Sequence, residues 1–195
     1  VIKNSRPERI GFYVSLLFGG MGFAYLSSDR LFLSSWVDWM SVVVLILSLC
    51  SAWVYSVHMN DLADISIDTI SNPTRPLIQG SLTARDMQES AHILLASALL
   101  GSFAAGYFPF FMTVLFLSTY HIYSTPPLRL KCVPILSSFL ISVAVLATVL
   151  SGYFFISPDK NFHMFPISLA VGIMVVFTLA ANVRDVKEVD FKLVK

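Results

Sequence analysis

The sequence predicts an all-α bundle whose helices cross a lipid bilayer several times. The chain has 195 residues, of which 56% are hydrophobic and only 13% are charged, whereas soluble domains have about 25% charged residues. Its mean hydropathy is +0.75. Apolar runs close to the roughly 20 residues that a spanning helix needs recur along the chain. The polar surface of a soluble protein is missing, so we expect the bilayer to be the solvent of this bundle.

Six segments qualify, or nearly qualify, as membrane-spanning helices. They are residues 10–27, 40–59, 87–106, 108–123, 133–157 and 162–182. The third and fourth segments are short or interrupted, by Gly106 and Pro109, so one tight helical hairpin is an alternative there. Thr83 followed by Asp86 resembles a capping box at the start of the third segment, and Pro134 suits the first turn of the fifth.

The basic residues predict how these helices are oriented. With the N-terminus inside, only Arg30 and Lys160 of the 13 Lys and Arg residues fall in outer loops, and such a bias marks the cytoplasmic side. This count favours six separate spans, and it places the segments around residues 60–68, 123–131 and 182–190 on the cytoplasmic side. The net charge of +1 argues against a nucleic acid partner, because phosphate binding requires clustered excess Lys and Arg.

An acidic segment follows the second expected span. On an ideal helix, its four polar residues fall within about 100° of one another and share one face. They are Asn60, Asp61, Asp64 and Asp68. Carboxylates stacked in this way repel one another and are costly to desolvate without a cation. Carboxylate and amide oxygens suit Mg²⁺, which often completes its shell with substrate phosphates. The segment therefore predicts a magnesium site, and the alternative is an acidic loop in solvent.

A second acidic segment follows the sixth expected span. Asn182 and Asp185 are three residues apart and face one way, while Asp190 lies beyond them on a different side of an ideal helix. This segment is either a second metal site or a solvated charged tail.

The loop of residues 123–131 brings cations to the same side. Its two prolines force an extended turn, which presents the side chains of Tyr123, Arg129 and Lys131. The alternative is a positive-inside loop anchored by an interfacial tyrosine. Two acidic faces and several cations on one side of an apolar bundle suit a diphosphate joined to a long hydrocarbon, because Mg²⁺ and Arg both bind phosphate oxygens.

Cysteine and histidine residues give no further site. Cys50 and Cys132 lack metal or redox spacing, so we expect free thiols. The histidines at 58, 92, 121 and 163 lack the spacing of metal ligands.

The sequence resembles the UbiA superfamily of intramembrane prenyltransferases. The first family signature, NDxxDxxxD, is matched in full by Asn60, Asp61, Asp64 and Asp68. A family turn of the type N-x-x-R-P and a nearby glycine are matched by Asn72, Arg75, Pro76 and Gly80. The Tyr-Ser-x-Pro-Pro-Leu-Arg/Lys-Leu-Lys loop found in many members is reproduced by residues 123–131.

The second family signature, D-x-x-D-x-x-G-D, is matched only in part. Asn182 replaces the first Asp, Asp185 matches, the glycine is absent, and Asp190 sits one residue late. Members usually have nine spans. The resemblance therefore implies that residues 1–195 form one transmembrane domain that corresponds to the first two-thirds of the fold and is incomplete at its C-terminus.

The resemblance implies Mg²⁺-assisted ionisation of an isoprenyl diphosphate and transfer of the prenyl group to an acceptor. The implied metal ligands are Asn60, Asp61, Asp64, Asp68, Asn182, Asp185 and Asp190. The implied substrate-binding residues are Asn60, Arg75, Tyr123, Arg129 and Lys131. Catalytic roles fall to Asp64, Asp68, Tyr123 and Asp185.

The acceptor stays open at this point. Relatives use aromatic rings, tetrapyrroles, ether-lipid precursors or phosphoribosyl groups, and nothing in the sequence selects among them. A membrane transporter or cation-binding protein that uses the acidic face without catalysis is the non-enzymatic alternative. A phospholipid-type phosphotransferase is disfavoured, because its DGxxAR run is absent.

Overall fold

The computed structural model describes residues 7–26 and 36–157, together with several positions between 168 and 179. The elements are α1 (Pro7–Leu26), α2 (Trp36–Ala63), α3 (Ile65–Ser71), α4 (Ala84–Ala105), α5 (Tyr107–Ser124), the 3₁₀ helix η2 (Leu130–Cys132) and α6 (Pro134–Ile156). Every regular element within these residues is a helix, which confirms the all-α fold class. The sixth expected span, 162–182, lies largely outside the described residues.

Three of the described helices are long and apolar enough to cross a membrane. They cover Pro7–Leu26, Asp38–Ala63 and Ile135–Ile156. Helices α4 and α5 contain 22 and 18 residues, which gives them lengths of about 33 and 27 Å, but their polar ends lower their hydropathy. The count of six spans therefore stays a prediction.

The ends of α4 follow from local sequence. The Thr83 hydroxyl accepts a hydrogen bond from the Asp86 backbone N–H at 3.1 Å, and the Asp86 carboxylate accepts one from the Thr83 N–H at 3.4 Å. This confirms the predicted capping box. At the other end, Gly106 has a φ of +143° and separates α4 from α5, which is a conformation that favours glycine.

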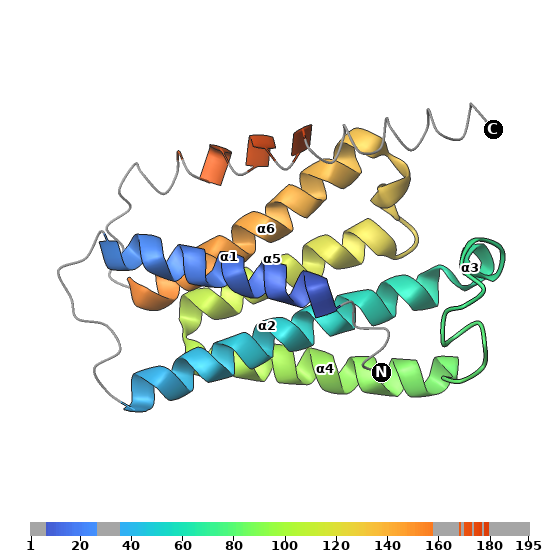
Figure 1. Cartoon of the computed structure of the whole chain (residues 1–195), viewed down its shortest axis with the longest axis horizontal. Coiled ribbons are helices and arrows are strands. Elements are labelled where there is room, and N and C mark those ends of the chain that lie inside the picture. The colour runs from blue at the N-terminus through green and yellow to red at the C-terminus, as the bar shows by residue number, and fades with distance from the viewer. Residues whose placement is uncertain are drawn as a thin grey trace.

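The helices pack in pairs. Figure 1 shows α2 and α4 side by side, with α1 lying across α6. A Cβ atom added to Gly20 would lie 2.0 Å from the Val149 carbonyl oxygen, and one added to Gly152 would lie 2.1 Å from the Leu17 carbonyl oxygen. Only glycine allows the two backbones to come this close, as at many helix contacts in membranes.

The core of the described residues divides into three clusters. Apolar side chains such as Leu17 fill one, and a smaller one surrounds Tyr153. In the third, Tyr13 packs on Trp53 with ring centroids 5.0 Å apart and on Phe116 at 5.4 Å. This third cluster includes side chains of α2 and adjoins the end of that helix that carries the acidic segment.

Candidate active site

The sequence predicted one continuous helix through the acidic segment, but the helix is interrupted there. Helix α2 ends at Ala63, and Asp64 has φ −105° and ψ 7° before α3 begins at Ile65. The four polar side chains therefore do not share one helix face. They divide into two sets with different partners.

The carboxylates of this segment are nevertheless buried. Asp61, Asp64 and Asp68 are 2%, 8% and 3% exposed. An acidic loop in solvent is therefore excluded. Carboxylates buried to this extent need charged partners or hydrogen bonds, because desolvation of an unpaired charge is very costly.

The first set consists of Asp61 and Asp68, which hold Arg75. The Arg75 Nη1 atom lies 2.7 Å from Asp61 Oδ1 and also pairs with Asp68 Oδ2. The Asn72 amide donates a hydrogen bond to Asp68 Oδ1 at 3.0 Å. The turn after α3 thus folds back on the motif and fixes the guanidinium between two carboxylates.

The second set consists of Asn60 and Asp64, which meet the loop after α5. The Arg129 Nη2 atom lies 2.5 Å from Asp64 Oδ1, and the Lys131 ammonium pairs with Asp64 Oδ2. The same ammonium donates to Asn60 Oδ1 at 3.1 Å, and the Ser124 hydroxyl donates to that oxygen at 3.1 Å. Residues more than 60 positions apart in the sequence are joined here.

Arg129 has two features typical of a functional position. Its backbone is left-handed, with φ 40° and ψ 52°, a conformation that costs energy for a residue other than glycine. Within the part of the chain that the structure describes, its Nε atom is buried and has no hydrogen-bond partner. An unpaired buried N–H donor is rare in folded proteins and calls for an explanation.

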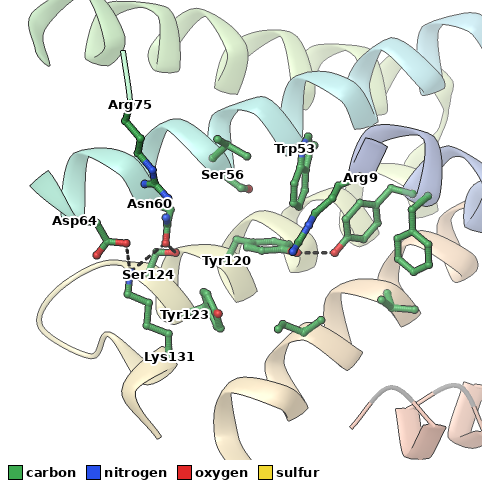
Figure 2. Close-up of a pocket in the computed structure, with 15 residues that line it drawn as sticks. Arg9, Trp53, Ser56, Asn60, Asp64, Arg75, Tyr120, Tyr123, Ser124 and Lys131 are labelled. Atoms are coloured by element: carbon green, nitrogen blue, oxygen red, sulfur yellow. Dashed lines mark hydrogen bonds and ion pairs between the residues drawn. The ribbon is translucent and has the colours of Figure 1, made fainter. Parts of the chain in front are cut away.

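A cavity of about 470 Å³ runs from this cluster along α2 (Figure 2). Its charged end is lined by Asn60, Asp64, Arg75, Tyr123, Ser124 and Lys131. Its other end is lined by Arg9, Phe12, Tyr13, Trp53, Ser56, Val57, Tyr120, Ile141 and Val145. The cavity therefore joins a highly charged region to a largely aromatic and apolar one.

The oxygen atoms of Asn60 and Asp64 at the charged end suit a cation that prefers oxygen ligands. Asn60 Oδ1 and Asp64 Oδ2 converge on a single positive group, the Lys131 ammonium. Within the described ranges, no cluster of three or more His, Cys, Asp or Glu side chains is close enough to hold a metal. Mg²⁺ usually takes one or two carboxylates and fills its other positions with water and substrate phosphates, so this pair suffices for a site of that type.

The predicted second acidic site cannot be compared with the first. Asn182, Asp185 and Asp190 lie outside the described residues, and their assignment as metal ligands stays a prediction. Cys50 and Cys132, in contrast, are free thiols, as expected.

Several residues that line the cavity were not predicted from the sequence. Arg9 and Tyr13 lie one turn apart on α1, and Trp53 and Tyr120 face the same space from α2 and α5. A signal was available for Arg9, because an ionisable residue at the edge of an apolar span is a functional candidate. The three aromatic residues carry no such signal, since most aromatic rings in spans serve packing alone.

Comparisons with known proteins agree with this arrangement. A family profile described as the UbiA prenyltransferase family matches residues 10–192. Naringenin 8-dimethylallyltransferase 2, chloroplastic, from Sophora flavescens is 33% identical over 164 residues, which cover 78% of this chain and 37% of that protein. The chain thus spans well under half the length of this curated relative.

Solved structures share the fold. A UbiA homolog from Archaeoglobus fulgidus bound to GPP and Mg²⁺ has a TM-score of 0.71 at 20% identity, covering 91% of this chain and 59% of its own. The same homolog bound to DMAPP and Mg²⁺ has a TM-score of 0.72 at 19% identity. A structure described for digeranylgeranylglyceryl phosphate synthase in membranes has a TM-score of 0.65 at 20% identity and covers 58% of that chain.

Proposed function

The chain belongs to the UbiA prenyltransferase family, and we propose that it is an intramembrane prenyltransferase acting on an isoprenyl diphosphate and an aromatic acceptor. One observation carries this proposal. A single cavity joins a cluster of carboxylates and cations to a space walled by aromatic rings. A diphosphate ester of a hydrocarbon has the same division between a charged and an apolar part.

The charged end suits the diphosphate. Arg75, Arg129 and Lys131 supply cations whose positions are set by buried carboxylates, and Tyr123 lines the same end. As the bond between prenyl C1 and the diphosphate oxygen breaks, its electron pair leaves with the diphosphate. Preorganised cations stabilise this developing charge better than solvent does.

Magnesium belongs to the same proposal. Asn60 and Asp64 are the described residues that would hold it, and Asp185 with Asn182 and Asp190 are proposed for a second ion. Bound there, magnesium would act as a Lewis acid on the leaving diphosphate. Asp61 and Asp68 hold Arg75 beside the site in this structure, and their assignment as further magnesium ligands stays a prediction.

The aromatic end suits the carbocation and its acceptor. Apolar and aromatic walls exclude water, which would otherwise capture the prenyl cation, and ring faces attract positive charge. The acceptor then forms a bond to prenyl C1 and loses a proton. The relative from Sophora flavescens, named for dimethylallyl transfer to naringenin, supports an aromatic acceptor.

The membrane side of the site is also proposed. The bias of Lys and Arg toward the loops that carry the charged cluster favours a cavity that opens on the cytoplasmic face. An isoprenyl diphosphate would then enter with its headgroup at the surface and its tail in the bundle.

The first experiment compares Asp64→Asn with Glu89→Gln in membranes. Asp64 is buried in the cluster, while Glu89 pairs with Arg85 on the exposed face of α4. We expect Asp64→Asn to lower prenyl transfer to naringenin from dimethylallyl diphosphate with Mg²⁺ by about 100-fold or more. Glu89→Gln should keep the normal rate. A normal rate in both variants would falsify the proposed role of the cluster.

A further inference from the structure

The aromatic end of the cavity contains a polar group that the proposed mechanism does not use. The hydroxyl oxygens of Tyr13 and Tyr120 are hydrogen-bonded at 2.5 Å, across α1 and α5. Tyr13 is 4% exposed. Arg9 lies one turn before Tyr13 on α1, and Figure 2 shows its side chain reaching toward the Tyr120 hydroxyl.

This group is rich in hydrogen-bond donors. Two phenolic hydroxyls joined by one hydrogen bond use one proton between their oxygens, and the proton of the accepting hydroxyl stays available. The Arg9 guanidinium adds several N–H donors and a permanent positive charge. A ligand atom at this position should therefore be an oxygen that accepts hydrogen bonds, and an anionic oxygen would bind most strongly.

A hydrocarbon tail fits the apolar lining of this end of the cavity, such as Ile141 and Val145, but not the polar group itself. A prenyl chain packed against the hydroxyl pair and the guanidinium would leave their donors without partners, which costs free energy. The aromatic residue Trp53 lies beside the pair, with its ring centroid 5.0 Å from that of Tyr13 and 5.7 Å from that of Tyr120. A flat ring that carries a polar oxygen satisfies both the aromatic wall and the donors.

We propose that Arg9, Tyr13 and Tyr120 form an acceptor subsite that binds a phenolate or carboxylate oxygen of an aromatic substrate. This rests on the proposed function, because it assigns the acceptor of that reaction. Trp53 and Asn60 are seven residues apart on α2, which corresponds to about 10 Å along the helix. The bound oxygen therefore lies roughly 10 Å along α2 from the charged end, where the proposed function places prenyl C1.

The subsite accounts for the choice of acceptor, which the sequence leaves open. An oxygen anchored by Arg9 and the hydroxyl pair orients the opposite edge of the ring toward the diphosphate end. The group fixes which ring carbon faces prenyl C1, so it acts as a specificity determinant. Acceptors without such an oxygen lose this anchor.

Binding in nanodiscs tests the subsite without turnover. The probes are naringenin and 4-hydroxybenzoate, each compared with its fully methylated counterpart, in the presence of Mg²⁺ and unreactive dimethylallyl thiolodiphosphate. Quenching of tryptophan fluorescence reports binding, because Trp53 lines the cavity. We expect unaltered protein to prefer at least one free probe over its methylated counterpart by about tenfold or more, as charge-assisted hydrogen bonds predict.

The variants Arg9→Gln, Tyr13→Phe and Tyr120→Phe should remove most of this preference and leave the affinity for the thiolodiphosphate within about twofold. Matched controls are Arg85→Gln and Tyr107→Phe, at exposed positions outside the cavity, and both should keep the preference. Thermal unfolding of each variant identifies misfolded protein, and Arg9→Lys keeps the charge if Arg9→Gln fails to fold.

Three results overturn the subsite. The first is that unaltered protein does not prefer a free probe over its methylated counterpart, and the second is that all three variants keep this preference unchanged. The third is that Arg9→Gln lowers the affinity for the thiolodiphosphate as much as it lowers the affinity for the free probe. The last result assigns Arg9 to the diphosphate. Failure of the thiolodiphosphate to bind unaltered protein, with the probe preference intact, contradicts the proposed function and supports the subsite.

Discussion

Asp64 and Asp61 lie three residues apart, and both are buried, but they have different partners. Asp64 faces the cavity and is bound by Arg129 and Lys131 from the loop after α5. Asp61 shares Arg75 with Asp68 across the turn after α3. The same residue type in one motif can thus either line the cavity itself or hold a cation that lines it. Burial alone does not distinguish these two roles.

Asp64 and Asp61 should differ most in their effect on the Mg²⁺-dependent affinity for dimethylallyl diphosphate. Asp64→Asn removes the only carboxylate among the described residues lining the cavity, so we expect Mg²⁺-dependent binding of dimethylallyl diphosphate to weaken by about 100-fold or more. Asp61→Asn should weaken it by about tenfold, as loss of a supporting contact usually does. Calorimetry in nanodiscs measures both. Equal losses in the two variants would erase the proposed division of the motif.

The next largest effect is expected on the free energy of unfolding, when the ion pair between Asp68 and Arg75 is removed. Asp68→Asn leaves a guanidinium with one carboxylate fewer, and breaking a fully buried pair costs about 3–5 kcal/mol. Since the Arg75 side chain is 22% exposed, we expect roughly 1–3 kcal/mol instead. Thermal unfolding in detergent measures the change.

The double variant Arg75→Gln/Asp68→Asn sharpens this result. The two residues are in contact, so their effects should not add, and the double variant should lose less stability than the sum of the two single variants. It should still be less stable than Asp68→Asn alone, because it also removes the cation that pairs with Asp61. Additive losses would mean that Asp68 and Arg75 stabilise the fold independently.

A substitution at the contact between α1 and α6 should lower the stability of the whole fold, and it does not distinguish the roles of Asp61 and Asp64. Gly20→Ala forces a Cβ atom to within 2.0 Å of the Val149 carbonyl oxygen, and α1 has to move away from α6 at a cost of about 1–3 kcal/mol. Gly19→Ala is the matched control, because nothing lies within 4 Å of its added Cβ atom. That control should unfold at the same or a slightly higher temperature. Equal destabilisation of both variants would contradict the close contact of α1 and α6.

The smallest effect is expected at an exposed ion pair. Arg85 Nε lies 2.8 Å from Glu89 Oε1, with the side chains 87% and 60% exposed. Arg85→Gln should change the free energy of unfolding by no more than about 0.5 kcal/mol, because solvent screens such pairs. A loss as large as that of Asp68→Asn would show that exposure is a poor guide to the strength of these pairs.

Much of the fold could be predicted because its signals are local. Long apolar runs predict the helices, Thr83 and Asp86 predict the start of α4, and Pro134 predicts that of α6. The spacing of the acidic motif predicted one shared face, but its carboxylates divide between two sets of partners. The break at Asp64 was missed, because helical spacing assumes a continuous helix and the ion pairs that stabilise a bend come from elsewhere in the chain.

Local patterns along the chain establish that this protein is a bundle of apolar helices and which residues carry charge among them, since hydropathy and spacing depend only on neighbouring residues. How those charges pair, and what lines the cavity between them, depends on the packing of helices that are distant in the sequence. Lys131 reaches Asn60 across 71 positions, and Tyr13 reaches Tyr120 across 107. Contacts over such separations depend on how the helices pack, and no local pattern encodes the partner.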